Sequence, residues 1–109
     1  MSLPHSTAPW AKELQVCAVR SLLHGVRVSN KSAATFWLFT CDSNDSSPTA
    51  STACALPVPA NGDNFLDWRR CARLMNNGIY LAASSDPINK TLIAASDAFF
   101  ECAWTEFHA

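Results

Sequence analysis

The sequence is poor in charge, in glycine and in long apolar runs. Of its 109 residues 16% are charged, against about a quarter in a typical soluble domain. The net charge is −1, so the chain as a whole is not attracted to nucleic acid or to an anionic membrane surface. No apolar run approaches the roughly 20 residues of a membrane-spanning helix. We therefore expect neither a nucleic-acid partner nor a membrane partner.

Motifs of catalysis and metal binding are also missing. His24 could act as a base, but no nucleophile-elbow sequence accompanies it, so we interpret it as an ordinary strand residue. The oxygen-rich segment 42–45 lacks the glycine and the closing glutamate of a calcium-binding loop, and it is typical of a polar turn. We expect a protein that is not an enzyme and that carries no cofactor and no metal.

The five cysteines are scattered, odd in number and without a CxxC pair. They lie in or beside apolar stretches, which favours small buried side chains over a disulfide framework. A bridge between Cys41 and Cys54, which flank a polar loop, stays open as an alternative. The first ten residues show no basic start followed by an apolar stretch, so we expect no secretory signal.

What the sequence does contain is alternation with a period of two, which is typical of half-buried strands. Turn-forming residues separate the alternating segments, and residues 60–63 (Ala-Asn-Gly-Asp) predict a hairpin. The two prolines of segment 54–59 place that segment at a sheet edge. For residues 69–77 a helical turn and an irregular loop both remain possible. Strands are predicted within residues 14–30, 34–40, 54–59, 65–68, 78–84, 91–94 and 98–107.

These segments predict an all-β protein with a single antiparallel β-sandwich. We expect a jelly-roll-like domain of seven or eight short strands over residues 15–109. Residues 1–14 hold two prolines and little alternation, and they are predicted to form an extended N-terminal arm.

Five residues are candidates for contacts with a partner. Trp10 and Trp68 flank polar segments, so their rings are expected to be exposed. Arg69, Arg70 and Arg73 form the only local basic cluster. They could bind phosphates or a partner's carboxylates, or be neutralised in an ordinary surface network, and the balanced net charge favours a protein partner or such a network over nucleic acid.

Aromatic side chains suggest a second function, ligand binding, which is of a different class from contact with a protein partner. A small β-sandwich can bind a ligand such as a carbohydrate on an exposed aromatic platform. Trp10, Trp68 and Tyr80 are the candidates for such a platform.

One stretch resembles a known group of proteins. Residues 25–39 (GVRVSNKSAATFWLF) are similar to the opening "strand, Asn-x-Ser/Thr turn, strand" of small virion proteins of tailed bacteriophages. Residues 56–62, residues 77–84 and the closing aromatic strand follow in the same order, so the resemblance covers about residues 16–107. The five cysteines and the segment 69–75 depart from the pattern.

The resemblance implies a non-enzymatic structural component of a virus particle. Such proteins decorate or cement capsids, or form head-to-tail parts, as symmetric oligomers. We accordingly expect a homo-oligomer, made in the host cytoplasm and located in the virion. It would bind capsid or head-tail subunits through the sandwich surface and the arm. The resemblance implies no catalytic residues.

Overall fold

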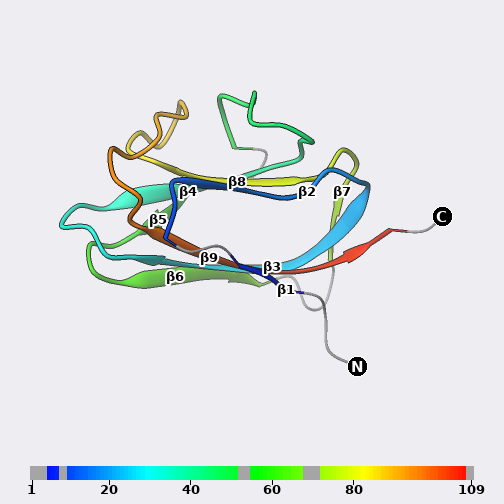
Figure 1. The fold of residues 1–109 in the computed structure, drawn as a ribbon, viewed down its shortest axis with the longest axis horizontal. Helices are drawn as coiled ribbons and strands as arrows, with labels where there is room; N and C mark the ends of the chain where they lie inside the picture. Colours follow the sequence, from blue (N-terminus) through cyan, green and yellow to red (C-terminus); the bar gives the residue numbers. More distant parts are fainter. Residues whose placement is uncertain (1–4, 8–9, 52–54, 68–71, 108–109) are drawn as a thin grey trace.

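The structure is a computed structural model that describes residues 5–7, 10–51, 55–67 and 72–107. These residues form nine strands and no helix, and every strand pairing is antiparallel. Two sheets pack face to face (Figure 1). The predicted all-β class and antiparallel sandwich are confirmed.

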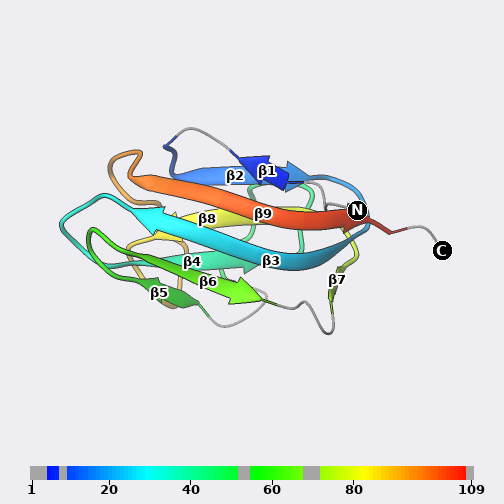
Figure 2. The ribbon, with the colours of Figure 1, turned by 90° about the horizontal axis from the view of Figure 1, so that it is seen from below.

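Each sheet has four strands in a continuous order, and one further strand joins the first sheet. Sheet A has the order β1 (His5–Thr7), β9 (Ala98–Glu106), β3 (Ser21–Asn30), β6 (Asp63–Asp67), and β7 (Arg73–Met75) also pairs with β3. Sheet B has the order β2 (Glu13–Cys17), β8 (Ile79–Ser84), β4 (Phe36–Cys41), β5 (Leu56–Val58). Figure 2 looks onto sheet A, with its strands side by side in this order.

Five of the seven pairings between the described strands are nested along the chain, and the other two, β3 with β9 and β4 with β8, join these pairs into the two sheets. The first strand pairs with the last, β2 pairs with β8, β3 pairs with β6 and β7, and β4 pairs with β5. Because partners lie far apart in the sequence, most connections cross from one sheet to the other at the ends of the sandwich (Figure 1).

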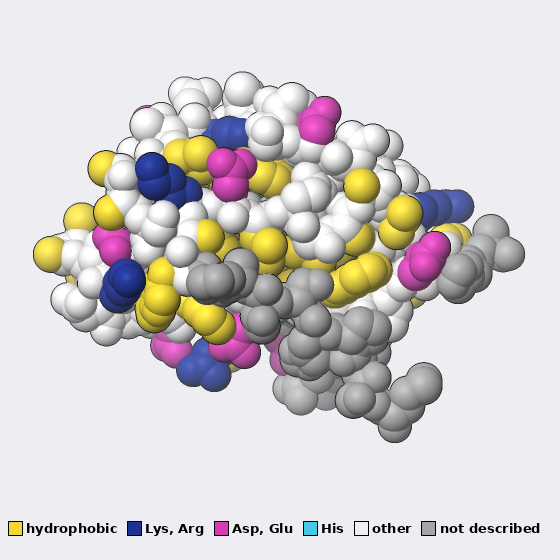
Figure 3. Space-filling view, in the orientation of Figure 1, with side chains coloured by type: hydrophobic (Ala, Val, Ile, Leu, Met, Phe, Trp, Pro, Cys, Tyr) yellow, Lys and Arg dark blue, Asp and Glu magenta, His cyan; other side chains and the backbone are white. Residues whose placement is uncertain are grey.

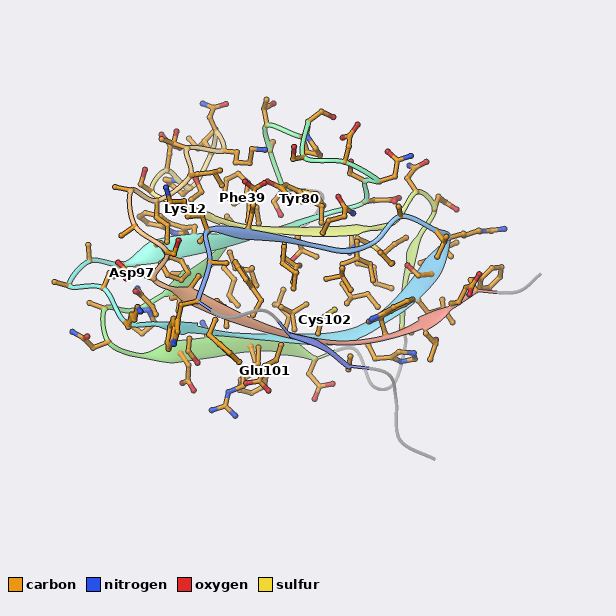
Figure 4. All side chains as sticks on the ribbon, in the orientation of Figure 1. Lys12, Phe39, Tyr80, Asp97, Glu101 and Cys102 are labelled. Atoms are coloured by element: carbon orange, nitrogen blue, oxygen red, sulfur yellow. The ribbon has the colours of Figure 1, made fainter. Side chains whose placement is uncertain are left out.

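The core lies between the two sheets and follows the alternation in the sequence. Val26 and Val28 of β3 and Phe100 of β9 point inward and are almost completely buried, while their neighbours point outward. Burying side chains of this size stabilises the fold by about 1.5–3 kcal/mol each. Figure 4 shows Cys102 in this space between the sheets and Glu101 on the opposite side of the same strand. The facing residues from sheet B are Phe36, Leu38, Val58, Ile79, Leu81 and Ala83.

Sheet B is also covered on its outer face. The segments 42–51 and 85–97 fold over β4 and β8 (Figure 1). They enclose a second small apolar cluster of Phe39, Cys41, Tyr80 and Ala82. Phe39 and Tyr80 lie between sheet B and these segments in Figure 4. Burial on both faces explains why the sequence of β4 and β8 is apolar almost throughout.

The segment predicted as an arm takes part in both sheets. In its described residues, β1 pairs with β9, and Ala11 exchanges two backbone hydrogen bonds of 2.7 and 3.0 Å with Ala98. Strand β2 then begins at Glu13, so the expected boundary at residue 14 falls inside a strand. Extended backbone beside an open sheet edge pairs with it, because its N–H and C=O groups need partners.

Three local predictions are wrong. Residues 91–94 form no strand, because Leu92 makes only an isolated bridge to Ser84 in the loop over sheet B. Residues 60–63 do form a turn, with Asn61 at φ 54° and Gly62 N–H donating to the Pro59 carbonyl, but the flanking β5 and β6 belong to different sheets. Turn-forming residues change the direction of the chain, but they do not determine which strand the next segment pairs with. In the described part of segment 69–77, Arg73–Met75 forms strand β7 and pairs with Ser21–Leu23. This part is therefore neither a helical turn nor an irregular loop. Pairing with β3 overrides the weak helical spacing.

Candidate functional site

The outer face of sheet A carries the candidate site, since the described residues provide no loop cover there comparable to that on sheet B. Strand β6 alternates along its length, so that Asp63, Phe65 and Asp67 point outward while Asn64 and Leu66 are half-buried. Phe65 is 64% exposed, which is unusual for a large aromatic residue in a strand.

The register of the sheet places small and charged residues beside Phe65. Gly25 lies opposite both Asp67 and Ala103, and in the next outward row Arg27 lies opposite both Phe65 and Glu101. Because Gly25 and Ala103 have almost no side chain, the surface is depressed between the larger side chains beside them. The result is a hollow of about 420 Å³ lined by Gly25, Val26, Arg27, Asp63, Phe65, Leu66, Asp67, Glu101 and Ala103, here called the first hollow.

An ion pair marks one end of the first hollow. The Arg27 Nη2 donates to Asp63 Oδ2 at 2.6 Å. This hydrogen bond, together with the charge of Asp63, raises the pKa of Arg27. Both side chains are exposed, and exposed pairs add little to the free energy of folding. The main effect of the pair is to hold the guanidinium on this face.

A second hollow of about 450 Å³ lies beyond the ion pair, lined by Trp10, Ser29, Asn30, Lys31, Asn61, Gly62 and Asp63. The ring of Trp10 is 40% exposed. Its centroid lies 5.7 Å from that of Phe99, and Lys31 Nζ lies 4.7 Å from the Trp10 centroid. Asp63 borders both hollows. In Figure 3, hydrophobic side chains and charged side chains of both signs meet along the lower rim of the molecule, on the side of sheet A.

Among the residues predicted to contact a partner, two lie in the described part of the chain. Trp10 is exposed as expected and packs on Phe99. Arg73 is half-buried in β7 at the edge of sheet A. Trp68, Arg69 and Arg70 lie outside the described residues, so their cluster with Arg73 stays a prediction.

The prediction that Tyr80 forms an exposed stacking platform is wrong. Its side chain is completely buried in β8 beneath the loops of sheet B. The phenol donates a hydrogen bond of 2.6 Å to Glu13 Oε1, and Lys90 Nζ donates one of 3.2 Å to the phenol oxygen. The loop that contains Lys90 covers the Tyr80 ring, and no local pattern in the sequence predicts that the loop folds there.

Sequence reasoning missed Phe65 and the hollow beside it. A signal was present, since Phe65 is in phase with Asp63 and Asp67 and must share their solvent-facing side of a strand. The contribution of Gly25, Arg27 and Glu101 depends on strand register, which no local pattern contains.

The residues considered for catalysis and for calcium binding form hydrogen bonds within the fold. His24 Nε2 lies 3.0 Å from Thr105 Oγ1 on the neighbouring strand. The Asp42 carboxylate accepts the backbone N–H groups of Asn76 and Asn77, and Asp45 accepts from Ser47. Hydrogen bonds from Ser47 lower the pKa of Asp45. Within the described ranges, no group of three or more His, Cys, Asp or Glu side chains is placed to hold a metal ion.

Of the three described cysteines, Cys41 and Cys102 are buried as predicted, whereas Cys17 is half-buried. The Cys41 thiol donates to the Ala50 carbonyl, and Cys102 lies in the main core. Cys54 lies outside the described residues, so a bridge between Cys41 and Cys54 stays an open alternative. In the part of the chain that the structure describes, no helix could cross a membrane.

Two buried acids make the fold sensitive to high pH. Burial raises the pKa of the Cys102 thiol from near 9 to about 12. Burial, with the hydrogen bond to Glu13, also raises the pKa of Tyr80. Both groups ionise at lower pH in the unfolded chain, so their contribution to stability is complete below about pH 8 and declines as the pH rises toward the folded-state values. We expect the urea midpoint to fall between about pH 8 and pH 11.

The matched measurement uses the double variant Tyr80→Phe with Cys102→Ala. This variant starts from a lower stability, but its midpoint should fall less steeply over the same pH range. Equal slopes for the two proteins would contradict the assignment of the alkaline sensitivity to these groups.

Comparison with known proteins adds no further assignment. No protein-family model matches this chain, and no curated protein or solved structure matches it either.

Proposed function

We propose that this protein is a non-enzymatic structural component of a virus particle, of the small β-sandwich type found in tailed bacteriophages. The observation that supports this proposal is the nested strand pairing, first with last, second with eighth, and fourth with fifth. A jelly roll also pairs its first strand with its last and nests further pairs inside them, and viral capsid domains and lectins use that architecture. The resemblance of residues 25–39 to phage virion proteins points to the same class.

The end of the sandwich where β2 leads into β3 is the surface best suited to contact other subunits. Val19 in that turn is 44% exposed, and Leu74 in β7, which pairs with β3 at this end, is 40% exposed. The Arg20 guanidinium lies 4.4 Å from the centroid of the Phe107 ring, and the Phe107 N–H donates to the Arg20 carbonyl. Arginine and aromatic side chains are enriched in protein interfaces. We call these four residues the end surface, and it lies near the C-terminus in Figure 1.

The proposal predicts a homo-oligomer that depends on the end surface. Light scattering after size exclusion should give one discrete mass larger than the monomer for the full chain. A double variant Val19→Glu with Leu74→Glu should give the monomer mass, because each copy would bury uncompensated charges in the interface. Deleting residues 1–14 is a poor test, because the deletion removes β1 and the start of β2.

Ile88→Glu is the matched control for this experiment. Ile88 is 72% exposed, and its segment 85–97 lies over sheet B at the other end of the sandwich from the β2–β3 turn (Figure 1). The control should keep the wild-type mass. A wild-type protein that stays monomeric, or a double variant that keeps the oligomer mass, would contradict the proposal.

The alternative function, a ligand-binding module, is favoured by a separate observation. The two hollows on sheet A combine exposed aromatic rings with charged side chains. These residues do not belong to the end surface, so one protein can have both functions.

A further inference from the structure

We propose that the outer face of sheet A binds an oligosaccharide of neutral or amine-bearing sugars. One sugar ring would lie in the first hollow against Phe65, and the next rings would extend across the ion pair toward Trp10. This binding site is distinct from the end surface and does not depend on a role in a virus particle.

The first hollow has the shape that a sugar ring needs. A pyranose presents an apolar face of C–H groups, which packs against an aromatic ring, and Phe65, a residue that is 64% exposed, offers such a ring. Gly25 and Ala103 form a floor without bulky side chains, so a ring can approach the backbone of the sheet. The volume of about 420 Å³ is within the range of small-molecule sites.

Polar groups surround this apolar floor at the places where sugar hydroxyls would lie. Asp67 and Glu101 flank it with carboxylate oxygens, and Arg27 adds guanidinium donors. A hydroxyl can donate and accept at once, so neighbouring hydroxyls of one sugar can pair with a carboxylate and with a guanidinium. Hydrogen bonds to charged groups are the stronger kind.

The charge of the first hollow selects among sugars. Among the described residues that line it, Asp63, Asp67 and Glu101 are acidic and Arg27 is basic, so this lining is net acidic. An acidic surface repels sulfated, phosphorylated and carboxylated ligands, and it repels nucleic acid for the same reason. Neutral sugars and sugars that carry an amine remain as ligands.

The second hollow argues for a chain of sugars rather than one ring. It shares Asp63 with the first hollow, so the two hollows lie next to each other on sheet A. Trp10 provides a second aromatic surface that is 40% exposed, and both Phe99 and the Lys31 ammonium pack against its ring. Because a longer chain would reach both rings, affinity should increase with the number of sugars.

The test is a titration of the full-length protein, followed by calorimetry, with three probes. These are neutral β-linked N-acetylglucosamine oligomers, the corresponding glucosamine oligomers, and a heparin-type sulfated oligosaccharide. We expect saturable binding of at least one of the first two probes, tighter for longer chains, and no saturable binding of the sulfated probe.

Variants then locate the site. Phe65→Ala should weaken binding about tenfold, and Gly25→Leu should abolish it by filling the floor. Circular dichroism checks that each variant is folded. Phe65→Ala removes a largely exposed ring and should fold, so the test does not depend on Gly25→Leu. Ile88→Ala, an exposed apolar residue on the opposite side, should bind as the wild type does.

Several results would overturn the proposal. They are the absence of saturable binding to both uncharged and amine-bearing probes, a preference for the sulfated probe, and unchanged binding by folded Phe65→Ala. A fourth is a wild-type oligomer that Phe65→Glu converts to monomers, because the face would then be occupied by a second copy of the chain. None of the binding results bears on the end surface, so the two proposals can fail separately.

Discussion

Replacing Gly78 with alanine should lower the free energy of unfolding by about 3–5 kcal/mol. Gly78 has φ +145°, a backbone conformation that residues with a Cβ rarely adopt. A Cβ at this position would come within 2.5 Å of the Cys17 carbonyl oxygen and 2.7 Å of the Ser43 carbonyl oxygen. Both are backbone atoms, so the clash cannot be relieved by turning a side chain.

The surroundings of Gly78 also resist adjustment. Gln15 Nε2 lies within hydrogen-bond distance of the carbonyls of Cys17, Ser43 and Ile79, at 2.7, 3.0 and 3.1 Å, and so ties three segments together around the glycine. Moving any one of them to make room would break part of this network. Strain and lost hydrogen bonds should therefore add to the steric cost.

Urea denaturation of the wild type and the variant measures the effect. Gly25→Ala is the matched control, because Gly25 has no positive φ and its added Cβ would lie 3.1 Å from the Leu66 carbonyl oxygen. A small local shift can relieve that contact, so we expect a loss of about 1 kcal/mol or less. If Gly78→Ala were no more costly than the control, the close approach of these three segments would be wrong.

Asn30→Ala should lower the free energy of unfolding by about 2–4 kcal/mol. Asn30 is buried at the end of β3, and its Nδ2 donates to the carbonyls of Ala34 and Val58 at 2.9 and 3.1 Å. Its Oδ1 accepts hydrogen bonds from the backbone N–H and the hydroxyl of Ser32. Alanine would leave the buried Val58 carbonyl without this donor, and the turn would lose its internal bonds.

The control for this prediction is Asn89→Ala. Asn89 begins the triplet Asn-Lys-Thr, of the same Asn-x-Ser/Thr type as the triplet that begins at Asn30, but Asn89 is exposed. Its substitution should change the urea midpoint little. Equal losses for the two variants would mean that turn composition, rather than the buried bonds to β5 and the β3–β4 turn, accounts for the effect.

The sequence by itself determined the fold class and much of the core. Alternation along β9 separates the buried Phe100 and Cys102 from the outward Glu101, and the apolar run of β8 requires cover on both faces. The two prolines around Val58 correctly predicted an edge strand, because proline has no N–H to donate to a neighbour. These features follow from the geometry of single strands, which a local pattern describes completely.

Only the tertiary structure decided which strands meet. The same turn residues 60–63 could close a hairpin, yet they carry the chain from sheet B to sheet A. The short strand Arg73–Met75 exists because Ser21–Leu23 provides a partner. Backbone hydrogen bonds are alike for every strand, so a sequence that specifies strands does not specify their pairing. Packing of the whole core makes that choice.

The candidate site depends on the same choice. Phe65, Arg27 and Glu101 come from three strands far apart in the chain, and they form one row because β6, β3 and β9 lie in that order and register. The cover of Tyr80 and the exposure of Phe65 likewise follow from which sheet the loops fold over. The sequence determined which side of its strand each residue occupies, and tertiary packing decided which of those sides meets solvent, because burial depends on neighbours that are distant in the chain.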